Sequence, residues 1–558
     1  MADRTGGEIL VANLLAQGAT HAFGVPGESY LAVLDALHDV GDRLRFHVCR
    51  QEGGAAYMAE AYGKLTGRPG IALVTRGPGA TNAAVGVHTA AQDSTPMLLL
   101  VGQVGTDMTD REAFQEIDYR RMYGHVAKWA AQIDRVERVP EYVAHAYRIA
   151  LAGRPGPVVL ALPEDMLSAR ADVADAPRVE SLPIAPSPAQ VDAVRAALAR
   201  ATAPLLIVGG SRWDAEACAA LRAFAERTGL PVACAFRRQD ILDNRHPSYV
   251  GDVGISPNPR LAARVRDADV LLVVGERLGE MTTGGYTLLD VPQPKQALIH
   301  VHPGSEELGR VYQPAIAINA TPLAFLQALD AAAIPARDAW RDATAAARAD
   351  YEAWRAPRPV PGDVDLWRIV RWLDERLADD AIVANGAGNY ATWMHRLFRY
   401  RGPGSQLAPY SGSMGYGVPA AIAAKALHPQ RTVVSWNGDG CFLMNGQELA
   451  TAVQYGLAVI FCVVDNGMYG TIRMHQERTY PARVSGTELV NPDFAALARA
   501  YGAHGATVTR TDEFAPAFER AAAAGGPALL HLKVDPQALT MGASLDALRA
   551  QGEAARAR

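Results

Sequence analysis

Two polar residues, each beside glycine, stand at the ends of two apolar segments of this 558-residue chain. Asp439 lies in a Gly-Asp-Gly turn after TVVSW, and Asn466 lies in an Asp-Asn-Gly turn after LAVIFCVV. Oxygen ligands of this kind suit Mg²⁺, which prefers octahedral oxygen coordination at about 2.0–2.1 Å and shares its shell with substrate phosphates. Gly438 and Gly440 allow backbone amides to approach a phosphate closely. The pattern predicts a diphosphate bound through a metal ion.

Either turn alone is more often a structural feature than a binding site. The pair is more informative, because a helix near 447–455, with Gly456 suited to its C-terminal cap, connects the two apolar segments. If those segments are neighbouring parallel strands, their ends meet at the edge of the sheet where ligands bind. We therefore expect Asp439 and Asn466 to converge on one point.

The elements that would position these residues alternate regularly between short apolar runs and segments of helical length. Runs such as FHVCR, IALVT, MLLLVG, LLIVGG, VLLVVG and VIFCVV are bounded by Gly, Pro or Asn, as is typical of parallel sheets covered on both faces. Two proline-containing stretches, 169–190 and 338–363, interrupt the pattern and are expected to connect domains. The sequence thus predicts three consecutive parallel-sheet α/β domains, at 1–170, 190–335 and 360–540, followed by a tail at 541–558.

An internal similarity relates the first and third domains. AEAYGKLTGRPGIALVTRGPGATNAAVG and AIAAKALHPQRTVVSWNGDGCFLMNG both run from helix through turn and strand to a glycine-rich turn, at similar spacing. A duplicated α/β module is expected, with the middle domain as a third sheet.

Composition narrows the class of protein. Apolar residues make up 49% and charged residues 20% of the chain, and the net charge is −5, so we expect neither nucleic acid nor membrane as a partner. Five scattered cysteines without metal-site spacing indicate reduced thiols, and the first residues lack a secretory pattern. These features predict a cytoplasmic enzyme.

The arrangement around Asp439 resembles the thiamine-diphosphate signature, in which G-D-G is followed some twenty-odd residues later by asparagine. The resemblance implies that Asp439, Asn466 and the backbone carbonyl of Met468 hold Mg²⁺. It also implies that several C-terminal residues contact the cofactor. Met414, in SGSMGYG, would hold thiamine in its bent shape, and ANGAGNYATW would form a diphosphate turn. The cofactor-binding residues implied in this region are Gly388, Asn389, Met414, Gly438, Gly440 and Asn466.

The thiamine-enzyme resemblance also requires a carboxyl group in the first domain, to stabilise the imino form of the cofactor's aminopyrimidine. Glu52, in RQEGGAAYMAEAYGKLTG, follows a strand-like run and opens a helix in a setting similar to that of the family's glutamate. A glutamate at a helix N-terminus also favours the helix by about 0.3–1 kcal/mol, which is the alternative, purely structural interpretation. In this family the two half-sites face each other across subunits, so a homodimer or homotetramer is implied.

Within the family, the chain is most similar to the acetolactate synthase branch. REAFQE matches a substrate-pocket element of the synthases, where Gln115 would orient a 2-oxoacid or its acceptor, and there is no His-His pair of the decarboxylase type. The resemblance implies decarboxylation of a 2-oxoacid such as pyruvate, with transfer to a second carbonyl compound. Glu28 instead suggests a non-oxidative decarboxylase that releases an aldehyde, with Glu28 as the acid. Arg76 is expected either to face solvent or to pair with Glu28.

Other functions fit less well. Bound FAD is disfavoured, because Gly279 and Glu280 replace the two acids of the family's flavin segment, although Gly209–Gly210 follows a strand. A non-catalytic nucleotide-binding or regulatory subunit is disfavoured by the presence of Glu52 and the metal ligands. A nicotinamide-dependent dehydrogenase would need a G-x-G-x-x-G turn opening a helix, which the chain lacks.

Overall fold

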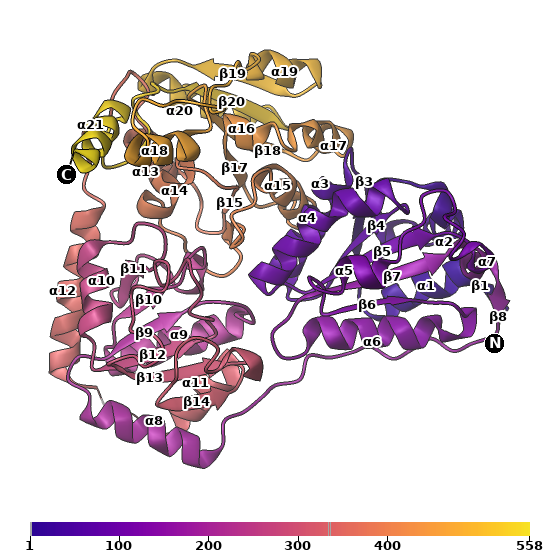
Figure 1. Cartoon of the computed structure of the whole chain (residues 1–558), viewed down its shortest axis with the longest axis horizontal. Helices are drawn as coiled ribbons and strands as arrows, with labels where there is room; N and C mark the ends of the chain where they lie inside the picture. The colour runs from indigo at the N-terminus through magenta and orange to yellow at the C-terminus, as the bar shows by residue number, and fades with distance from the viewer. Residues whose placement is uncertain (1–2, 333, 335, 558) are drawn as a thin grey trace.

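The computed structural model describes residues 3–332, 334 and 336–557. It contains three six-stranded parallel sheets, one in each of three successive α/β domains, as predicted (Figure 1). In Figure 1 the N-terminal domain lies at the right, the central domain at the lower left and the C-terminal domain at the top. None of the helices in the described part of the chain is both long enough and apolar enough to cross a membrane.

The N-terminal sheet has the strand order β3-β2-β4-β5-β7-β6. Its middle strands are buried along their whole length, which explains why IALV and MLLLVGQ contain no alternation of polar residues. The strands are β2 (His21–Gly24), β3 (Arg45–Val48), β4 (Gly70–Val74), β5 (Met97–Gln103), β6 (Trp129–Gln132) and β7 (Pro157–Pro163), and the short β1 (Arg4–Thr5) pairs with β8 (Arg170–Ala171). The helices are α1 (Gly6–Ala16), α2 (Leu31–Val40), α3 (Glu52–Thr66), α4 (Pro78–Asp93), α5 (Tyr119–Tyr123), α6 (Val139–Leu151) and α7 (Glu164–Ser168).

The C-terminal sheet repeats this topology, with the order β16-β15-β17-β18-β20-β19. Numbered within each domain, both sheets read 2-1-3-4-6-5, which confirms the predicted relation between the first and third domains. The strands are β15 (Ile382–Asn385), β16 (Gln406–Leu407), β17 (Val433–Gly438), β18 (Val459–Asp465), β19 (His504–Val508) and β20 (Ala528–Lys533). The helices are α13 (Leu366–Arg376), α14 (Tyr390–Leu397), α15 (Gly417–Leu427), α16 (Asp439–Phe442), α17 (Leu449–Gln454), α18 (Gly470–Thr479), α19 (Phe494–Ala500), α20 (Phe514–Ala523) and α21 (Leu545–Arg556).

The central sheet has a different order, β11-β10-β9-β12-β13-β14, which is that of dinucleotide-binding folds. Its strands are β9 (Leu205–Val208), β10 (Val232–Cys234), β11 (Tyr249–Asp252), β12 (Val270–Val274), β13 (Ala297–His302) and β14 (Ile316–Asn319), with α8 (Pro188–Arg200), α9 (Ala215–Thr228), α10 (Pro259–Asp267), α11 (Pro322–Ala331) and α12 (Asp338–Trp354). The α12 segment, which the sequence suggested as part of a connector, packs into the central core through Trp340 and Tyr351. Its amphipathic pattern reflects that packing.

Three helices join the N-terminal and C-terminal domains into one core. Helix α3 packs against both α4 and α15, and the buried residues of all three belong to a single apolar cluster. Small residues allow close approach within the N-terminal domain, where a Cβ on Gly86 of α4 would lie 2.3 Å from Cβ of Ala56 on α3, and the contact between domains is that of α3 with α15. The alanine-rich segments AEAYG and PAAIAA are therefore contact surfaces between domains.

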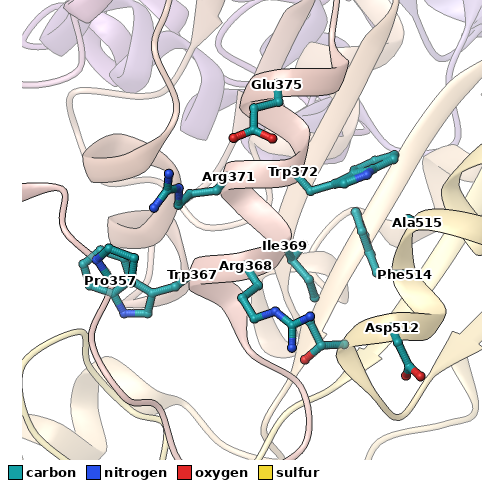
Figure 2. A pocket seen from close by; sticks show the side chains of 11 residues that line it. Pro357, Trp367, Arg368, Ile369, Arg371, Trp372, Glu375, Asp512, Phe514 and Ala515 are labelled. Atoms are coloured by element: carbon teal, nitrogen blue, oxygen red, sulfur yellow. The ribbon is translucent and has the colours of Figure 1, made fainter.

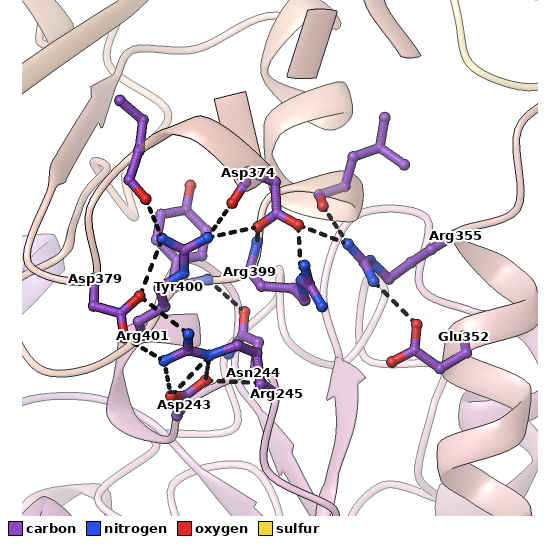
Figure 3. A network of polar contacts seen from close by, with 12 residues as sticks. Asp243, Asn244, Arg245, Glu352, Arg355, Asp374, Asp379, Arg399, Tyr400 and Arg401 are labelled. Carbon is purple, nitrogen blue, oxygen red and sulfur yellow. Dashed lines mark hydrogen bonds and ion pairs between the residues drawn. The ribbon is translucent and has the colours of Figure 1, made fainter. Parts of the chain in front are cut away.

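A buried carboxylate joins the central and C-terminal domains (Figure 3). The side chain of Asp374, on α13, is only 4% exposed and accepts hydrogen bonds from Arg355 at 3.4 Å and from Arg399 at 2.7 Å. Arg401 forms a further ion pair with it at 3.6 Å. Arg355 follows α12 of the central domain, so the network ties α12 to the C-terminal sheet.

We expect Asp374→Ala to destabilise the protein, because it removes the buried carboxylate that Arg355, Arg399 and Arg401 share. Removing one partner of a buried ion pair typically lowers the free energy of unfolding by about 3–5 kcal/mol. Thermal unfolding measured by calorimetry should show the loss, whereas Glu375→Ala, at the adjacent exposed position, should change the free energy of unfolding by no more than about 0.5 kcal/mol. Equal stability of the two variants would contradict this assignment.

Candidate active site

Asp439 and Asn466 meet at the carboxyl edge of the C-terminal sheet, as expected. β17 and β18 are adjacent and parallel, with Gly438 opposite Val464, so each turn begins at the same level of the sheet. The two turns are also bonded to each other, because the amide of Gly467 donates to Oδ2 of Asp439 at 3.0 Å. The predicted convergence of the two strand ends is confirmed.

The glycines beside Asp439 make room for two tyrosine rings. A Cβ on Gly438 would lie 2.6 Å from the ring of Tyr390, and a Cβ on Gly440 would lie 2.5 Å from the ring of Tyr469. Side chains at these positions would therefore displace the rings. The G-D-G sequence is required by local packing, independently of any bound phosphate.

The Asp439 carboxylate is buried, and it has no cationic partner in the part of the chain that the structure describes. It accepts hydrogen bonds from the amide of Gly440 at 2.8 Å and from Nδ2 of Asn491 at 2.8 Å, yet burial raises its pKa to about 6. The neighbouring Asp465 behaves differently: hydrogen bonds from His531 at 2.7 Å and from Asn491 outweigh the effect of burial and lower its pKa. A positive charge placed near Asp439 would favour its ionised form.

The donor set around Asp439 fits a magnesium ion. Oδ1 of Asn491 is buried and has no hydrogen-bond partner, so one oxygen beside the carboxylate is unsatisfied. Asn466 and Met468 line the same cavity as Asp439. Among the described residues there is no group of three His, Cys, Asp or Glu side chains that could hold a metal ion. A cation here would rely on one carboxylate with amide and carbonyl oxygens, and Mg²⁺ binds in this way when substrate phosphates complete its shell.

A cavity of about 230 Å³ extends from these turns. It is closed by α14 on one side and by the segment near Leu539 on the other, and it is lined largely by apolar and glycine surface. All the cofactor and metal residues predicted in the C-terminal domain line it, namely Gly388, Asn389, Met414, Gly438, Asp439, Gly440, Asn466 and Met468. The residues that the sequence predicted in this domain therefore lie together around one cavity, as the prediction requires.

A larger cavity, of about 400 Å³, lies elsewhere on the C-terminal domain, between α13 and α20 (Figure 2). Ile369, Trp372 and Phe514 form its apolar wall, with charged side chains such as Arg368 and Asp512 also lining it. None of the predicted site residues lines this cavity. We therefore assign the site to the smaller cavity.

Glu52 opens α3 in the N-terminal domain, as the sequence predicted. Its carboxylate is half-buried and accepts a hydrogen bond from Nδ2 of Asn82 on α4 at 2.9 Å. Gly79 leaves space beside the other carboxylate oxygen, 3.4 Å from the position that a Cβ would take. Val85, an exposed apolar residue, lies next to the start of the helix. The carboxylate therefore faces a surface where apolar groups are exposed in the single chain.

Glu448, which the sequence did not single out, fixes the turn before Glu52. Its carboxylate comes from the C-terminal domain and accepts hydrogen bonds from the amides of Arg50 at 3.0 Å and Gln51 at 2.9 Å. It is fully buried, and burial raises its pKa. The only signal in the sequence is a glutamate followed by a threonine three residues later, and that threonine, Thr451, donates to it at 2.6 Å.

Gln115 and Glu28 lie on the same edge of the N-terminal sheet as Glu52. Gln115 adopts a positive φ of 66° in a loop and packs against Gly77. Glu28 follows β2, its side chain is 70% exposed, and it pairs with Arg76 at 3.6 Å. The side chain of Arg76 is only 9% exposed, and it also pairs with Glu164 at 3.4 Å. The expectation that Arg76 pairs with Glu28 is confirmed, and Glu164 is a second partner of Arg76 that sequence reasoning missed.

The structure does not bring the two halves together within one chain. No described residue of the N-terminal domain lines the Asp439 cavity, so Glu52, Gln115 and Glu28 lie outside it. Both halves expose large apolar side chains: Phe114 is 72% exposed beside Gln115, and Ile472 is 56% exposed at the cavity. Each half-site therefore has a large apolar side chain exposed beside its polar residues in the single chain.

The central domain carries a buried carboxyl group where its strand order leads one to expect a nucleotide crevice. Its strand order places that crevice after β9, at Gly209 and Gly210. Glu276 fills the space there: a Cβ on Gly209 would lie 2.6 Å from Oε2 of Glu276, a carboxyl group that is 2% exposed. Burial raises the pKa of Glu276, whose other oxygen accepts a hydrogen bond from Thr282 at 3.1 Å.

Comparison with known proteins agrees with this geometry. Three family models match in order: the N-terminal TPP binding domain of the thiamine pyrophosphate enzymes at residues 4–122, their central domain at 191–329 and their C-terminal TPP binding domain at 386–532. The acetolactate synthase isozyme 2 large subunit of Escherichia coli is 33% identical over 95% of both chains. The probable acetolactate synthase large subunit of Methanocaldococcus jannaschii is 32% identical over 96% of this chain and 93% of its own. The mitochondrial acetolactate synthase catalytic subunit of Saccharomyces cerevisiae is 30% identical over 95% and 81%, respectively.

Proposed function

The chain belongs to the thiamine pyrophosphate enzyme family, and from that premise we propose that it joins a decarboxylated 2-oxoacid to a second carbonyl compound, as an acetolactate synthase-like carboligase. Pyruvate is the proposed donor, by similarity to the acetolactate synthases to which the chain is related. The observation that carries the proposal is the meeting of Asp439 and Asn466 in one cavity at the sheet edge.

We propose that Asp439, Asn466 and the carbonyl of Met468 hold Mg²⁺, and that Gly388, Asn389 and the Asp439 turn hold the diphosphate. When bound, thiamine diphosphate supplies the carbon centre that accepts the 2-oxoacid and retains the electron pair after CO₂ is lost. Met414 presents an apolar side chain in the same cavity, where it would set the bend of the cofactor.

Glu52 would act from the partner subunit. Within one chain it lies outside the Asp439 cavity, whereas a second copy could place its Glu52 surface over that cavity and cover the exposed apolar side chains. The carboxyl group would then hold a proton shared with the cofactor's pyrimidine. Glu448 would position Glu52 indirectly, by fixing the amides of Arg50 and Gln51. We therefore propose a homodimer, or a tetramer built from such dimers.

We expect Asp439→Ala to release the cofactor, because the variant loses the only carboxylate among the proposed metal ligands. The affinity for thiamine diphosphate at saturating Mg²⁺ should fall at least about tenfold, measured by titration calorimetry. Asp512→Ala provides a matched control, because it changes an exposed aspartate at the other cavity of the same domain. Undiminished cofactor retention in Asp439→Ala would contradict the proposed anchor.

A mixed dimer tests whether sites form between subunits. We expect Glu52→Gln and Asp439→Ala homodimers to be inactive, because each lacks one half of every site. A heterodimer of the two, purified with two affinity tags, keeps one intact pair and should show about half of the wild-type rate, since one site in two is complete. A heterodimer as inactive as its parents would place both halves in the same chain.

Simple decarboxylation with release of an aldehyde is the second candidate. The observation that favours it is the exposed Glu28 carboxylate, which lies on the same sheet edge as Glu52 and could deliver a proton in place of the acceptor. Gln115, as a neutral donor and acceptor, would orient the 2-oxoacid or the acceptor in either reaction.

Product analysis separates the two reactions. With pyruvate alone we expect acetolactate as the main product of the wild-type protein, measured by chromatography beside acetaldehyde. Glu28→Gly should lower the acetaldehyde share further, because it removes the competing proton donor. Glu164→Gln, which changes the other partner of Arg76, provides the control and should leave the product ratio near that of the wild type. Acetaldehyde as the main product would support the decarboxylase, and an unchanged ratio in Glu28→Gly would dismiss a role for that carboxyl group.

We further propose that the central domain binds no flavin. A carboxyl group beside Gly209 and Gly210 occupies the place where a dinucleotide's pyrophosphate would approach the first turn of the sheet. The domain would then serve to hold the other two in place. The five cysteines are all buried and unpaired, which fits the cytoplasmic location that we propose.

A further inference from the structure

The segment that carries Met414 is held at several points by other domains of the same chain. This Met414 loop, residues 408–416, connects β16 to α15. Nζ of Lys64 on α3 donates to the carbonyl of Ala408 at 2.8 Å, and the amide of Ser411 donates to Oδ1 of Asp93 on α4 at 3.2 Å. The C-terminal ends of α3 and α4 thus hold the first half of the loop.

The second half of the loop is held by α3 as well. The hydroxyl of Tyr57 donates to the carbonyl of Met414 at 3.4 Å. The hydroxyl of Tyr416 donates to Oε2 of Glu60 at 2.5 Å, and both groups are fully buried. Contacts from the N-terminal domain therefore lie before, at and after Met414.

Three of the anchoring residues form a buried charged group, Glu60–Lys64–Asp93. The side chains of Glu60 and Asp93 are 0% and 1% exposed, and that of Lys64 is 15% exposed. Lys64 bonds directly to Asp93 and lies 3.3 Å from Oε1 of Glu60. Thr95 donates to the same glutamate oxygen at 2.7 Å, and burial raises the pKa of Glu60. The polar groups of the triad are thus satisfied by one another and by the loop.

A buried charged triad is not the arrangement that stability alone would select. Replacing buried ion pairs by well-packed apolar residues is often neutral or stabilising, whereas directional bonds fix geometry. The loop needs such fixing, because Gly412 and Gly415, at φ of 68° and 81°, flank Met414 and give the backbone freedom on both sides. The triad supplies bonds on each side of these two glycines.

We infer that the Glu60–Lys64–Asp93 triad positions Met414 against the cofactor of its own subunit. The inference rests on the proposed function, since it assigns the loop's rigidity to cofactor geometry. The three residues touch neither the cavity nor its ligand and act through the loop. Loss of the triad would leave the cofactor site assembled but allow Met414 to move, and a displacement of about 1 Å can lower a catalytic rate on the order of a hundredfold.

Lys64→Met tests this role. We expect faster backbone amide exchange across residues 408–416, measured by mass spectrometry without substrate, and a several-fold weaker affinity for thiamine diphosphate. With pyruvate, kcat should fall roughly 10–100-fold while KM changes by less than about twofold. Asp93→Asn, which is nearly isosteric, should show the same pattern to a smaller extent, and it carries the test if Lys64→Met does not fold.

The matched control is Lys425→Met. Lys425 lies on α15, directly after the loop, and its Nζ donates to the carbonyl of Arg431 at 2.8 Å. The control removes a half-buried lysine from the adjoining helix without touching the loop, so amide exchange at 408–416 and kcat should stay near the wild-type values. If Lys64 contributed only to overall stability, Lys64→Met and Lys425→Met would change amide exchange and kcat in the same way.

A double-mutant cycle with Met414→Ala decides whether Lys64 acts through Met414. If it does, adding Lys64→Met to Met414→Ala should lower kcat little further, whereas independent effects would multiply. The inference is overturned if the losses multiply, or if the 408–416 amides exchange at the wild-type rate in both Lys64→Met and Asp93→Asn. A wild-type protein that fails to bind thiamine diphosphate would instead contradict the proposed function itself.

Discussion

The buried carboxylate of Asp439, at the end of a central strand, is the constraint around which the C-terminal domain is organised. Parallel pairing of β17 and β18 brings the Asp439 and Asn466 turns to one level, and the amide of Gly467 bonds the two turns together. Because the carboxylate is buried and no described residue supplies it with a cationic partner, a cation bound beside it would stabilise its ionised form. The unsatisfied Oδ1 of Asn491 lies beside the carboxylate and is a second oxygen that such a cation could use.

Both charged and apolar contacts hold the three domains in position relative to one another. Asp374 fixes the central domain to the C-terminal sheet, and Lys64 with its two carboxylates fixes the N-terminal helices to the loop before α15. Apolar surfaces, such as the alanine-rich faces of α3 and α15, bring domains together but tolerate small shifts. Directional bonds between buried groups remove that freedom. A site assembled from several domains needs this second kind of contact.

Sequence reasoning succeeded where local pattern determines position. The rule that ligands gather at the ends of parallel strands was sufficient for Asp439 and Asn466, since each directly follows a strand. It could not find Asn491 or Glu448, because their partners lie far along the chain and neither stands in a turn or motif with its own signal. The sequence also could not predict that Arg76 pairs with Glu164, because Glu164 follows a different strand, β7. The helical pattern of α12 was visible, but only tertiary packing shows that it completes the central core.

The shared strand order of the first and third domains has a consequence for the history of the chain. Helices α3 and α15 occupy equivalent places, each preceding the third strand of its sheet, and they pack against one another. The contact between these domains therefore approximates a two-fold axis inside a single polypeptide. A gene duplication that fused two copies of a self-associating ancestor would leave this pseudosymmetry, with catalysis later divided between copies that had once been identical.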